Sequence, residues 1–185
     1  IVWDYWAKGR KLRAETIVGG TPIVTFVSGE FYTIADMLTR KGVAIRRAPE
    51  AIAADKAHPG ERAFGREGEE MIAKGAEFVR SESLSGRPCK MYRLTEERGK
   101  TEVWLTDDKR KLPVRVEFSR RDTGAKSTTD YIDWIADLEL TDAFFEPDPR
   151  VELARVEYAD YVTRSQAGNI VGPAPVLFSN LLHGR

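Results

Sequence analysis

The chain has 185 residues, 42% of them hydrophobic, with 29 basic and 29 acidic side chains and a formal net charge of zero. This length fits about one domain, and the hydrophobic content is sufficient for a core, which excludes wholesale disorder. The balanced charge excludes the strongly basic surface of a general nucleic-acid-binding protein, so no nucleic-acid partner is expected. No stretch approaches the roughly 20 consecutive apolar residues of a membrane span.

Side chains that could carry chemistry are few. The two histidines, His58 and His183, are far apart and fit no metal-ligand spacing, so we expect neither a metal nor another cofactor. Cys89 is the only cysteine, which excludes an internal disulfide; an inert buried thiol is its usual role, and a reactive thiol is the alternative. Because nucleophile-elbow, P-loop and dinucleotide motifs are also absent from the sequence, we expect no catalytic residues and no enzymatic activity.

Extended segments separated by turn residues dominate residues 2–36. Lys11–Val18 alternates charged with mostly apolar side chains, which predicts a half-exposed strand. Ile23–Val27 is apolar on both faces except at Thr25, which is typical of a strand that is covered on both sides. This region therefore predicts three antiparallel strands.

Two short helices are predicted next. Pro49 at a first helical position introduces the Ala-rich run Glu50–Ala57, and Pro59 ends it. A second helix is predicted over Arg66–Lys74, with Gly75 as its C-terminal cap. Both helices are too short to be stable alone, so they must pack on the sheet.

Strand patterns then return in close succession, at Ala76–Leu84, Cys89–Thr95, Thr101–Thr106, Leu112–Arg120 and Ser127–Leu138. With about eight strands and two small helices, the pattern predicts an α+β fold: a single curved antiparallel half-barrel sheet with short helices covering its apolar concave face. The regular pattern ends near Pro149. We therefore predict a half-barrel domain over residues 1–149 and a C-terminal extension over 150–185.

Several motifs occur in an order that resembles the LolA/LolB-like superfamily, of which the chain would be a divergent member: Lys11–Glu15, Ser28–Tyr32, Val103–Leu105, Lys111–Val116 and Asp142–Pro147. That superfamily includes periplasmic lipoprotein carriers and RseB-type lipoprotein sensors. The resemblance implies a half-barrel with helices as a lid over an apolar cavity. It implies a non-enzymatic, outer-membrane lipoprotein-sorting type of carrier in the periplasm or cell envelope, which binds an acyl chain of a lipoprotein or lipid. The alternative is an RseB-like regulatory or scaffolding module without transported cargo.

Eight apolar side chains at alternating strand positions are candidates for the cavity lining: Val24, Phe26, Trp104, Val114, Val116, Phe118, Ile132 and Trp134. The same pattern fits a filled core, and the two interpretations stay open. Arg13 matches the strand arginine that in the carriers contacts the lid. Pairing of Arg13 with Glu15 on the strand surface is the alternative.

The tail ends in an apolar run that includes Val176–Phe178 and Leu181-Leu182. Full burial of one such side chain gains about 1.5 to 3 kcal/mol, so we expect the tail to dock on the domain or on an envelope protein partner. The Arg46-Arg47 pair and the run Lys109–Lys111 could meet anionic head groups in a peripheral membrane contact; solvated turns are the alternative. The chain opens at Ile1 rather than Met, which predicts a processed or truncated product whose signal peptide or lipid-anchored cysteine would lie upstream.

Overall fold

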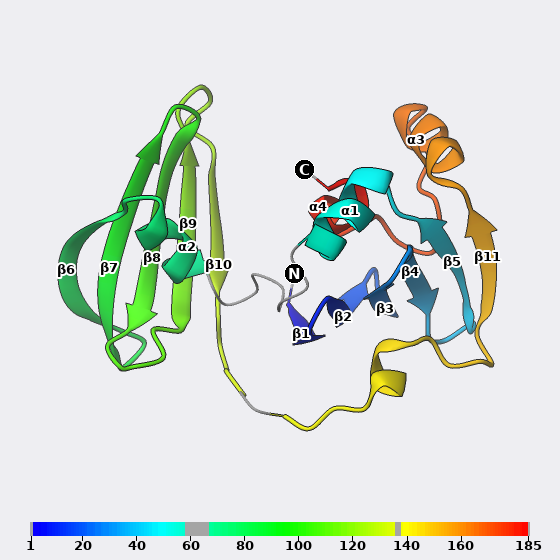
Figure 1. Ribbon diagram of the computed structural model, residues 1–185, viewed down its shortest axis with the longest axis horizontal. Helices are drawn as coiled ribbons and strands as arrows, with labels where there is room; N and C mark the ends of the chain where they lie inside the picture. Colours follow the sequence, from blue (N-terminus) through cyan, green and yellow to red (C-terminus); the bar gives the residue numbers. More distant parts are fainter. Residues whose placement is uncertain (1, 58–66, 136–137, 185) are drawn as a thin grey trace. The chain divides into compact units, whose positions relative to one another are not determined.

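The computed structural model describes residues 2–57, 67–135 and 138–184 (Figure 1). It is an α+β protein with two open sheets and few short helices. The chain divides into two compact units: unit 1 comprises Ile1–Arg62 and Glu139–Arg185, and unit 2 comprises Ala63–Leu138. The predicted α+β class is confirmed, but the single curved half-barrel sheet is wrong.

Unit 1 contains a six-stranded mixed sheet in the order β1-β2-β3-β4-β5-β11. Its strands are β1 (Trp3–Lys8), β2 (Lys11–Val18), β3 (Thr21–Ser28), β4 (Phe31–Asp36), β5 (Lys41–Arg46) and β11 (Glu152–Val156). The first five pair in antiparallel succession, whereas β11 pairs in parallel with β5. Because β11 occupies the outer edge of β5, the next strand in the sequence cannot extend this sheet there. This pairing is the physical reason why one continuous sheet does not form.

Different segments cover the two faces of this sheet (Figure 1). Helices α1 (Pro49–Ala57) and α4 (Ser179–His183) lie on one face, and the 3-10 helix η1 (Asp142–Phe145) lies on the other, against β2 and β3. The predicted helix at Glu50–Ala57, with Pro49 in its first turn, is confirmed. Its position on the sheet agrees with the expectation that so short a helix needs tertiary packing.

Residues after Pro149 belong to unit 1. Besides β11 they form α3 (Tyr158–Gln166) and α4, and Leu182 is fully buried. Gly172 has a φ of 104° and lies against the side chain of Val43, so neither the backbone conformation nor the space suits a larger residue. The predicted domain boundary at residue 149 stays a prediction, because packing alone does not show which part folds independently.

Unit 2 contains a five-stranded antiparallel sheet in the order β10-β9-β8-β7-β6. Its strands are β6 (Glu77–Leu84), β7 (Arg87–Glu96), β8 (Gly99–Thr106), β9 (Pro113–Arg120) and β10 (Lys126–Asp130). Helix α2 (Glu67–Ala73) contacts β7 and β8 and covers part of one face (Figure 1). The second predicted helix is thus confirmed over Glu67–Ala73, while Arg66, where it was predicted to begin, lies outside the described residues. The run of hairpins is confirmed as well.

The last predicted strand, Ser127–Leu138, is shorter in the structure because its partner ends. Asp130 pairs with Arg115, and the backbone N–H of Tyr131 donates to the carbonyl oxygen of Val114. The next partner, Pro113, is the first residue of β9 and has no N–H to donate. The ladder therefore ends at this point, and Ile132, Trp134 and Leu138 are not part of a strand; Ala136, predicted for the same strand, lies outside the described residues.

Candidate ligand-binding groove

The structure distributes the eight predicted lining residues over both units. Val24 and Phe26 are buried in β3 of unit 1, on the face that η1 covers. The other six lie in unit 2 or in the segment that follows β10: Trp104, Val114, Val116, Phe118, Ile132 and Trp134. Of the eight, only Phe26 lines either of the two pockets described below. Their assignment to an acyl-chain cavity therefore stays a prediction.

Within unit 2, apolar side chains occupy both faces of the sheet. Val103 packs with Met71 of α2, and Val116 lies against this cluster. Trp104, next in sequence, packs on the opposite face with Met91 and Val114. Phe118 and Trp134 are half-buried, whereas Ile132 is 66% exposed. A strand buried on both faces cannot reveal its cavity side by alternation, so the sequence pattern alone was ambiguous here.

Arg13 takes part in both of the interactions that the sequence left open. Its guanidinium pairs with Glu15 at 2.6 Å, and its NH1 donates to the carbonyl oxygen of Phe144 at 3.1 Å. The same guanidinium lies 4.3 Å from the ring centroid of Phe144 and 5.4 Å from that of Phe26. The covering segment that Arg13 contacts is therefore η1.

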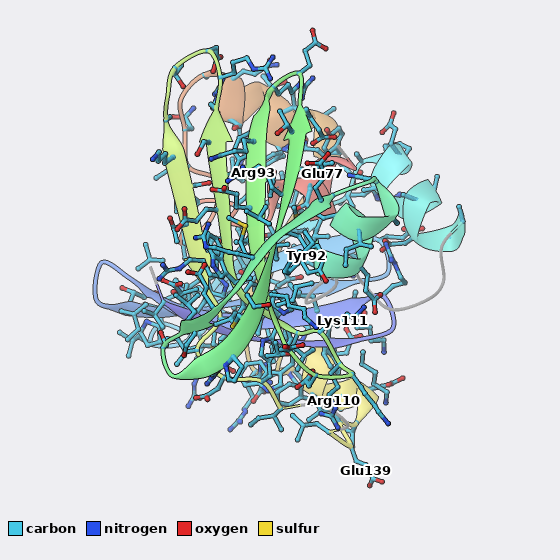
Figure 2. All side chains as sticks on the ribbon, turned by 90° about the vertical axis from the view of Figure 1, so that its left-hand side faces the viewer. Glu77, Tyr92, Arg93, Arg110, Lys111 and Glu139 are labelled. Carbon is cyan, nitrogen blue, oxygen red and sulfur yellow. The ribbon has the colours of Figure 1, made fainter. Side chains whose placement is uncertain are left out.

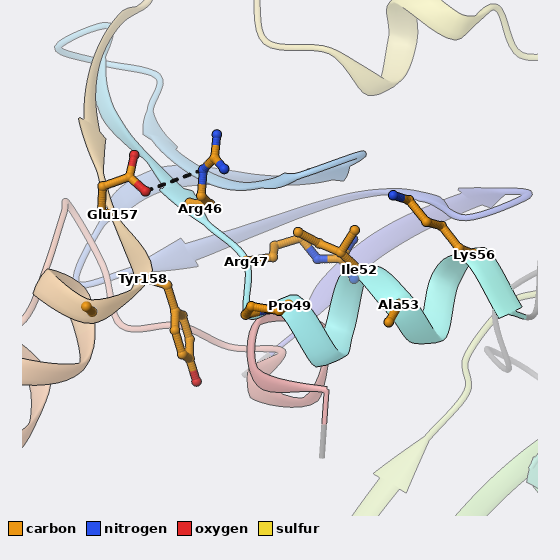
Figure 3. A pocket seen from close by; sticks show the side chains of 9 residues that line it. Arg46, Arg47, Pro49, Ile52, Ala53, Lys56, Glu157 and Tyr158 are labelled. Carbon is orange, nitrogen blue, oxygen red and sulfur yellow. Dashed lines mark ion pairs between the residues drawn. The ribbon is translucent and has the colours of Figure 1, made fainter.

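A pocket of about 550 Å³ lies beside α1 in unit 1 (Figure 3). We call it the α1 groove; it is lined by Arg46, Arg47, Pro49, Ile52, Ala53, Lys56, Glu157, Tyr158 and Ala159. The four residues from α1 are spaced i, i+3, i+4 and i+7, so they form one stripe along the helix. The first turn of α3 supplies the facing wall. The volume falls within the range of about 300 to 1,000 Å³ that is usual for small-molecule sites.

Charged groups lie at both ends of the α1 groove, and Arg47 also lines it, together with apolar side chains such as Ile52 and Ala53. Figure 3 shows Lys56 at the C-terminal end of α1, and Arg46 with Glu157 beyond the N-terminal end. Arg46 forms ion pairs of 3.4 Å with Glu157 and with Glu30. Lys56 forms no ion pair with any residue that the structure describes. The lining thus has three cationic side chains against one carboxylate.

A buried charge network fixes α1 in place. Arg47 is 2% exposed, and its guanidinium donates at 2.7 Å each to Asp55 and to the carbonyl oxygens of Gly29 and Leu181. Arg10 donates to the other oxygen of Asp55, at 2.6 Å. Two guanidinium groups on one carboxylate hold the C-terminal half of α1 against the sheet, as expected of charge-assisted bonds in a partly buried site.

The facing wall is held by α4. The Tyr158 hydroxyl and His183 Nδ1 are 2.8 Å apart, and the His183 ring also lies 5.8 Å from that of Tyr161. The backbone N–H of Ala48, just before α1, donates to the carbonyl oxygen of Leu182. Residues distant in sequence thus position both walls of the α1 groove through the same short helix.

A second, smaller pocket of about 310 Å³ lies on the η1 face of unit 1. Phe26, Phe31 and Leu153 contribute apolar surface, while Glu146 and Arg155 are charged. Glu146 already accepts a hydrogen bond of 2.7 Å from Ser28. With less volume and a mixed lining, this pocket is less suited to an alkyl chain than the α1 groove.

Several charged groups of unit 2 are engaged by neighbouring side chains. Figure 2 shows Tyr92 and Arg93 on β7 and Glu77 at the start of β6. Arg93 donates to Glu102 at 2.7 Å; burial acts to raise the pKa of this carboxyl, but Arg93 and Lys100 together lower it overall. Trp104 Nε1 donates to Glu82 at 2.6 Å, and this hydrogen bond is the main reason why the Glu82 pKa is lowered. Glu82 and Glu102 therefore serve as structural hydrogen-bond acceptors within the sheet.

Cys89 is 1% exposed beside Met91 and Trp104, and burial raises the pKa of its thiol. A thiolate is therefore disfavoured at this position. Among the described residues, no group of three or more His, Cys, Asp or Glu side chains could hold a metal ion. None of the described helices has the length and apolar character to cross a membrane.

Sequence reasoning missed the α1 groove as a site, although parts of it carried signals. The stripe of Pro49, Ile52, Ala53 and Lys56 has helical spacing, and the Arg46-Arg47 pair was a candidate for anionic head groups. The facing wall had no signal, because α3 lies in a tail for which no regular structure was predicted.

Scans of protein-family models and of curated proteins found no match to this chain. The resemblance to the LolA/LolB-like superfamily therefore rests on the sequence motifs alone.

Proposed function

We propose that the protein is a non-enzymatic carrier of the cell envelope or periplasm that binds an acyl chain of a lipid or lipoprotein. The observation that carries this proposal is the α1 groove, a pocket of about 550 Å³ whose lining includes Ile52, Ala53 and Tyr158. The motif resemblance supports the same class of cargo. An apolar pocket with a few charged groups is the usual architecture of a site for an amphiphilic small molecule.

The energetics suit reversible carriage. Burying one methylene gains about 0.8 kcal/mol, so ten buried methylenes gain roughly 8 kcal/mol before the cost of ordering the chain and losing its freedom of movement. The full gain of about 8 kcal/mol would correspond to a dissociation constant of about 1 μM, and these costs make the binding weaker than that. Such a complex can load and release its cargo without chemical work.

Titration with a fluorescent fatty-acid probe tests this function. The full chain should bind the probe saturably, and unlabelled lipid should displace it. Ala53→Trp fills the α1 groove and should weaken binding at least about tenfold, because one indole replaces the space that several methylenes would occupy. Ala54→Trp is the matched control. It makes the same change at the next position of α1, which is exposed and is not among the residues that line the groove, so this variant should bind the probe normally. Saturable binding that Ala53→Trp leaves intact, or no saturable binding by folded protein, would contradict the proposal.

A second candidate is an RseB-like regulatory or scaffolding module. It is favoured by exposed apolar side chains in the segment after β10, namely Ile132 (66% exposed), Ile135 (73%) and Leu138 (48%). Apolar side chains clustered at a surface are typical of protein interaction sites. The triple replacement of these residues by Ser should leave fatty-acid binding intact if the carrier function is correct. Loss of a defined envelope partner in that variant, together with absent lipid binding in the parent protein, would favour the module.

A further inference from the structure

The charged residues at the ends of the α1 groove indicate which head group the ligand carries, in addition to its alkyl chain. Lys56 is exposed and forms no ion pair with a described residue, and it lies on the same helix stripe as Ile52 and Ala53. At the other end, Arg46 is held between two carboxylates by ion pairs of 3.4 Å. Of the cations at the two ends of the groove, Lys56 is therefore the one that no carboxylate of a described residue engages.

Resting on the proposed acyl-chain function, we infer that the ligand of the α1 groove is a single-chain amphiphile with an anionic head group. Its alkyl chain lies along Ile52 and Ala53, and its carboxylate or phosphate meets the ammonium of Lys56 (Figure 3). The long aliphatic stem of lysine packs on apolar surface while its charge stays in water, which suits the mouth of such a groove.

The charges around the α1 groove also favour an anionic head group. The residues that line the groove include three cations and one carboxylate, Glu157, which is engaged by Arg46. The buried Arg47 belongs to a cluster in which two guanidinium groups share Asp55, so that cluster adds positive potential beside the groove. A cationic or zwitterionic head group would find no unengaged carboxylate among the lining residues.

The test compares ligands that share a chain and differ in the head group. Dodecanoate, dodecyl phosphate and dodecanol are titrated below their aggregation concentrations at pH 8, where the carboxylate is ionised. Both anions should bind at least about threefold more tightly than the alcohol, which is the scale of one solvent-exposed ion pair. Raising the salt concentration should reduce this difference, because screening shortens the range of exposed charges. Inorganic phosphate alone should neither bind nor compete.

Charge reversal assigns the effect to one residue. Lys56→Glu should weaken binding of both anions about three- to tenfold and leave dodecanol unchanged. Lys74→Glu, the same change at an exposed lysine that follows α2, is the matched control for net charge and should have no effect. Arg46→Gln should also weaken the anions, because it removes a cation and leaves Glu157 unpaired beside the groove.

The outcomes separate this inference from the function on which it rests. If all three ligands bind equally well and Lys56→Glu changes none of them, the acyl-chain site stands and the head-group inference is wrong. If none of the three ligands binds to the folded protein, the proposed function is wrong, and so is the inference that rests on it. If inorganic phosphate competes with dodecyl phosphate, the groove is an anion site rather than an amphiphile site, and the inference is also wrong.

Discussion

Arg47 and Leu181 are 134 positions apart, yet Arg47 Nε donates a hydrogen bond of 2.7 Å to the carbonyl oxygen of Leu181. Through this contact Arg47, two positions before α1, holds α4, the last helix of the described chain. The same guanidinium donates to Asp55 on α1. One buried side chain therefore connects the sheet, the α1 groove and the C-terminal tail.

Replacing the guanidinium of Arg47 should destabilise the protein strongly. Arg47→Met leaves four acceptors that lose a buried charged donor, and we expect the free energy of unfolding to fall by about 3 kcal/mol. Urea unfolding followed by tryptophan fluorescence measures this change. Arg46→Met is the control; its side chain is 46% exposed and its ion pairs are longer, so the change should stay within about 1 kcal/mol. Equal effects of the two variants would mean that Arg47 does not anchor the tail.

The tail itself should be part of the stable core. Leu182 is fully buried, and Leu182→Ala should lower the free energy of unfolding by about 2 to 5 kcal/mol, the usual cost of a cavity. Ile170→Ala removes a side chain that is 66% exposed and should change stability by about 0.5 kcal/mol or less. Differential scanning calorimetry compares the two. If Leu182→Ala melts like the parent protein, the tail is not anchored as the structure shows.

Local patterns depend on neighbouring residues, and they predicted several elements correctly. However, residues 2–36, predicted to form three strands, form the four strands β1 to β4, and β5 was not predicted. The strand Lys11–Val18 coincides with β2, and the proline at position 49 begins α1 as its fixed φ favours. The arrangement of sheets depends instead on which strand takes the free edge of β5. That edge is filled by β11 from more than 100 residues further along the chain, and five residues in a tail give no local signal for this.

The candidate site also depends on contacts that local sequence patterns do not predict. Apolar residues on alternating positions were expected to line one cavity, but burial on both faces of a strand, as at Val103 and Trp104, produces the same pattern. The α1 groove depends on contacts between α1, α3 and α4. Helical spacing in the sequence predicts only the wall of the groove that α1 forms.

Tyr32 should make stability depend on pH in the alkaline range. Burial raises the pKa of Tyr32 from 10.0 to about 12, while the hydroxyl oxygen accepts a hydrogen bond from the backbone N–H of Phe178. In the unfolded chain the phenol ionises near pH 10, whereas in the folded protein it stays protonated up to about pH 12. The contribution of the neutral phenol to the free energy of unfolding is therefore fully present below pH 10 and is lost as pH rises through about 12. The unfolding free energy should therefore fall through this window.

Comparison with Tyr32→Phe isolates that contribution from the other groups that titrate in alkali. The variant lacks the ionisable hydroxyl and should lose less stability than the parent protein between pH 10 and 12, by up to about 2 to 3 kcal/mol. Below pH 10 the variant should be less stable by about 1 kcal/mol, because the N–H of Phe178 loses its acceptor. Parallel stability curves for the two proteins would contradict a raised pKa at Tyr32.

The unit that binds the acyl chain can be identified with one replacement made in two places. Ile52→Asp puts a carboxylate into the α1 groove, where it removes apolar surface and repels an anionic head group, so probe affinity should fall at least about tenfold. Trp134→Asp alters a residue predicted to line the cavity, but its indole stacks on Tyr131 and donates from Nε1 to the carbonyl oxygen of Pro113 at 2.7 Å. We therefore expect Trp134→Asp to lower the stability of unit 2 and to leave probe affinity unchanged. Titration of both variants, at a temperature where circular dichroism shows each to be folded, decides between the two locations. A large loss of affinity in Trp134→Asp, with normal binding by Ile52→Asp, would place the cargo among the residues predicted from strand alternation and would overturn the α1 groove as the binding site.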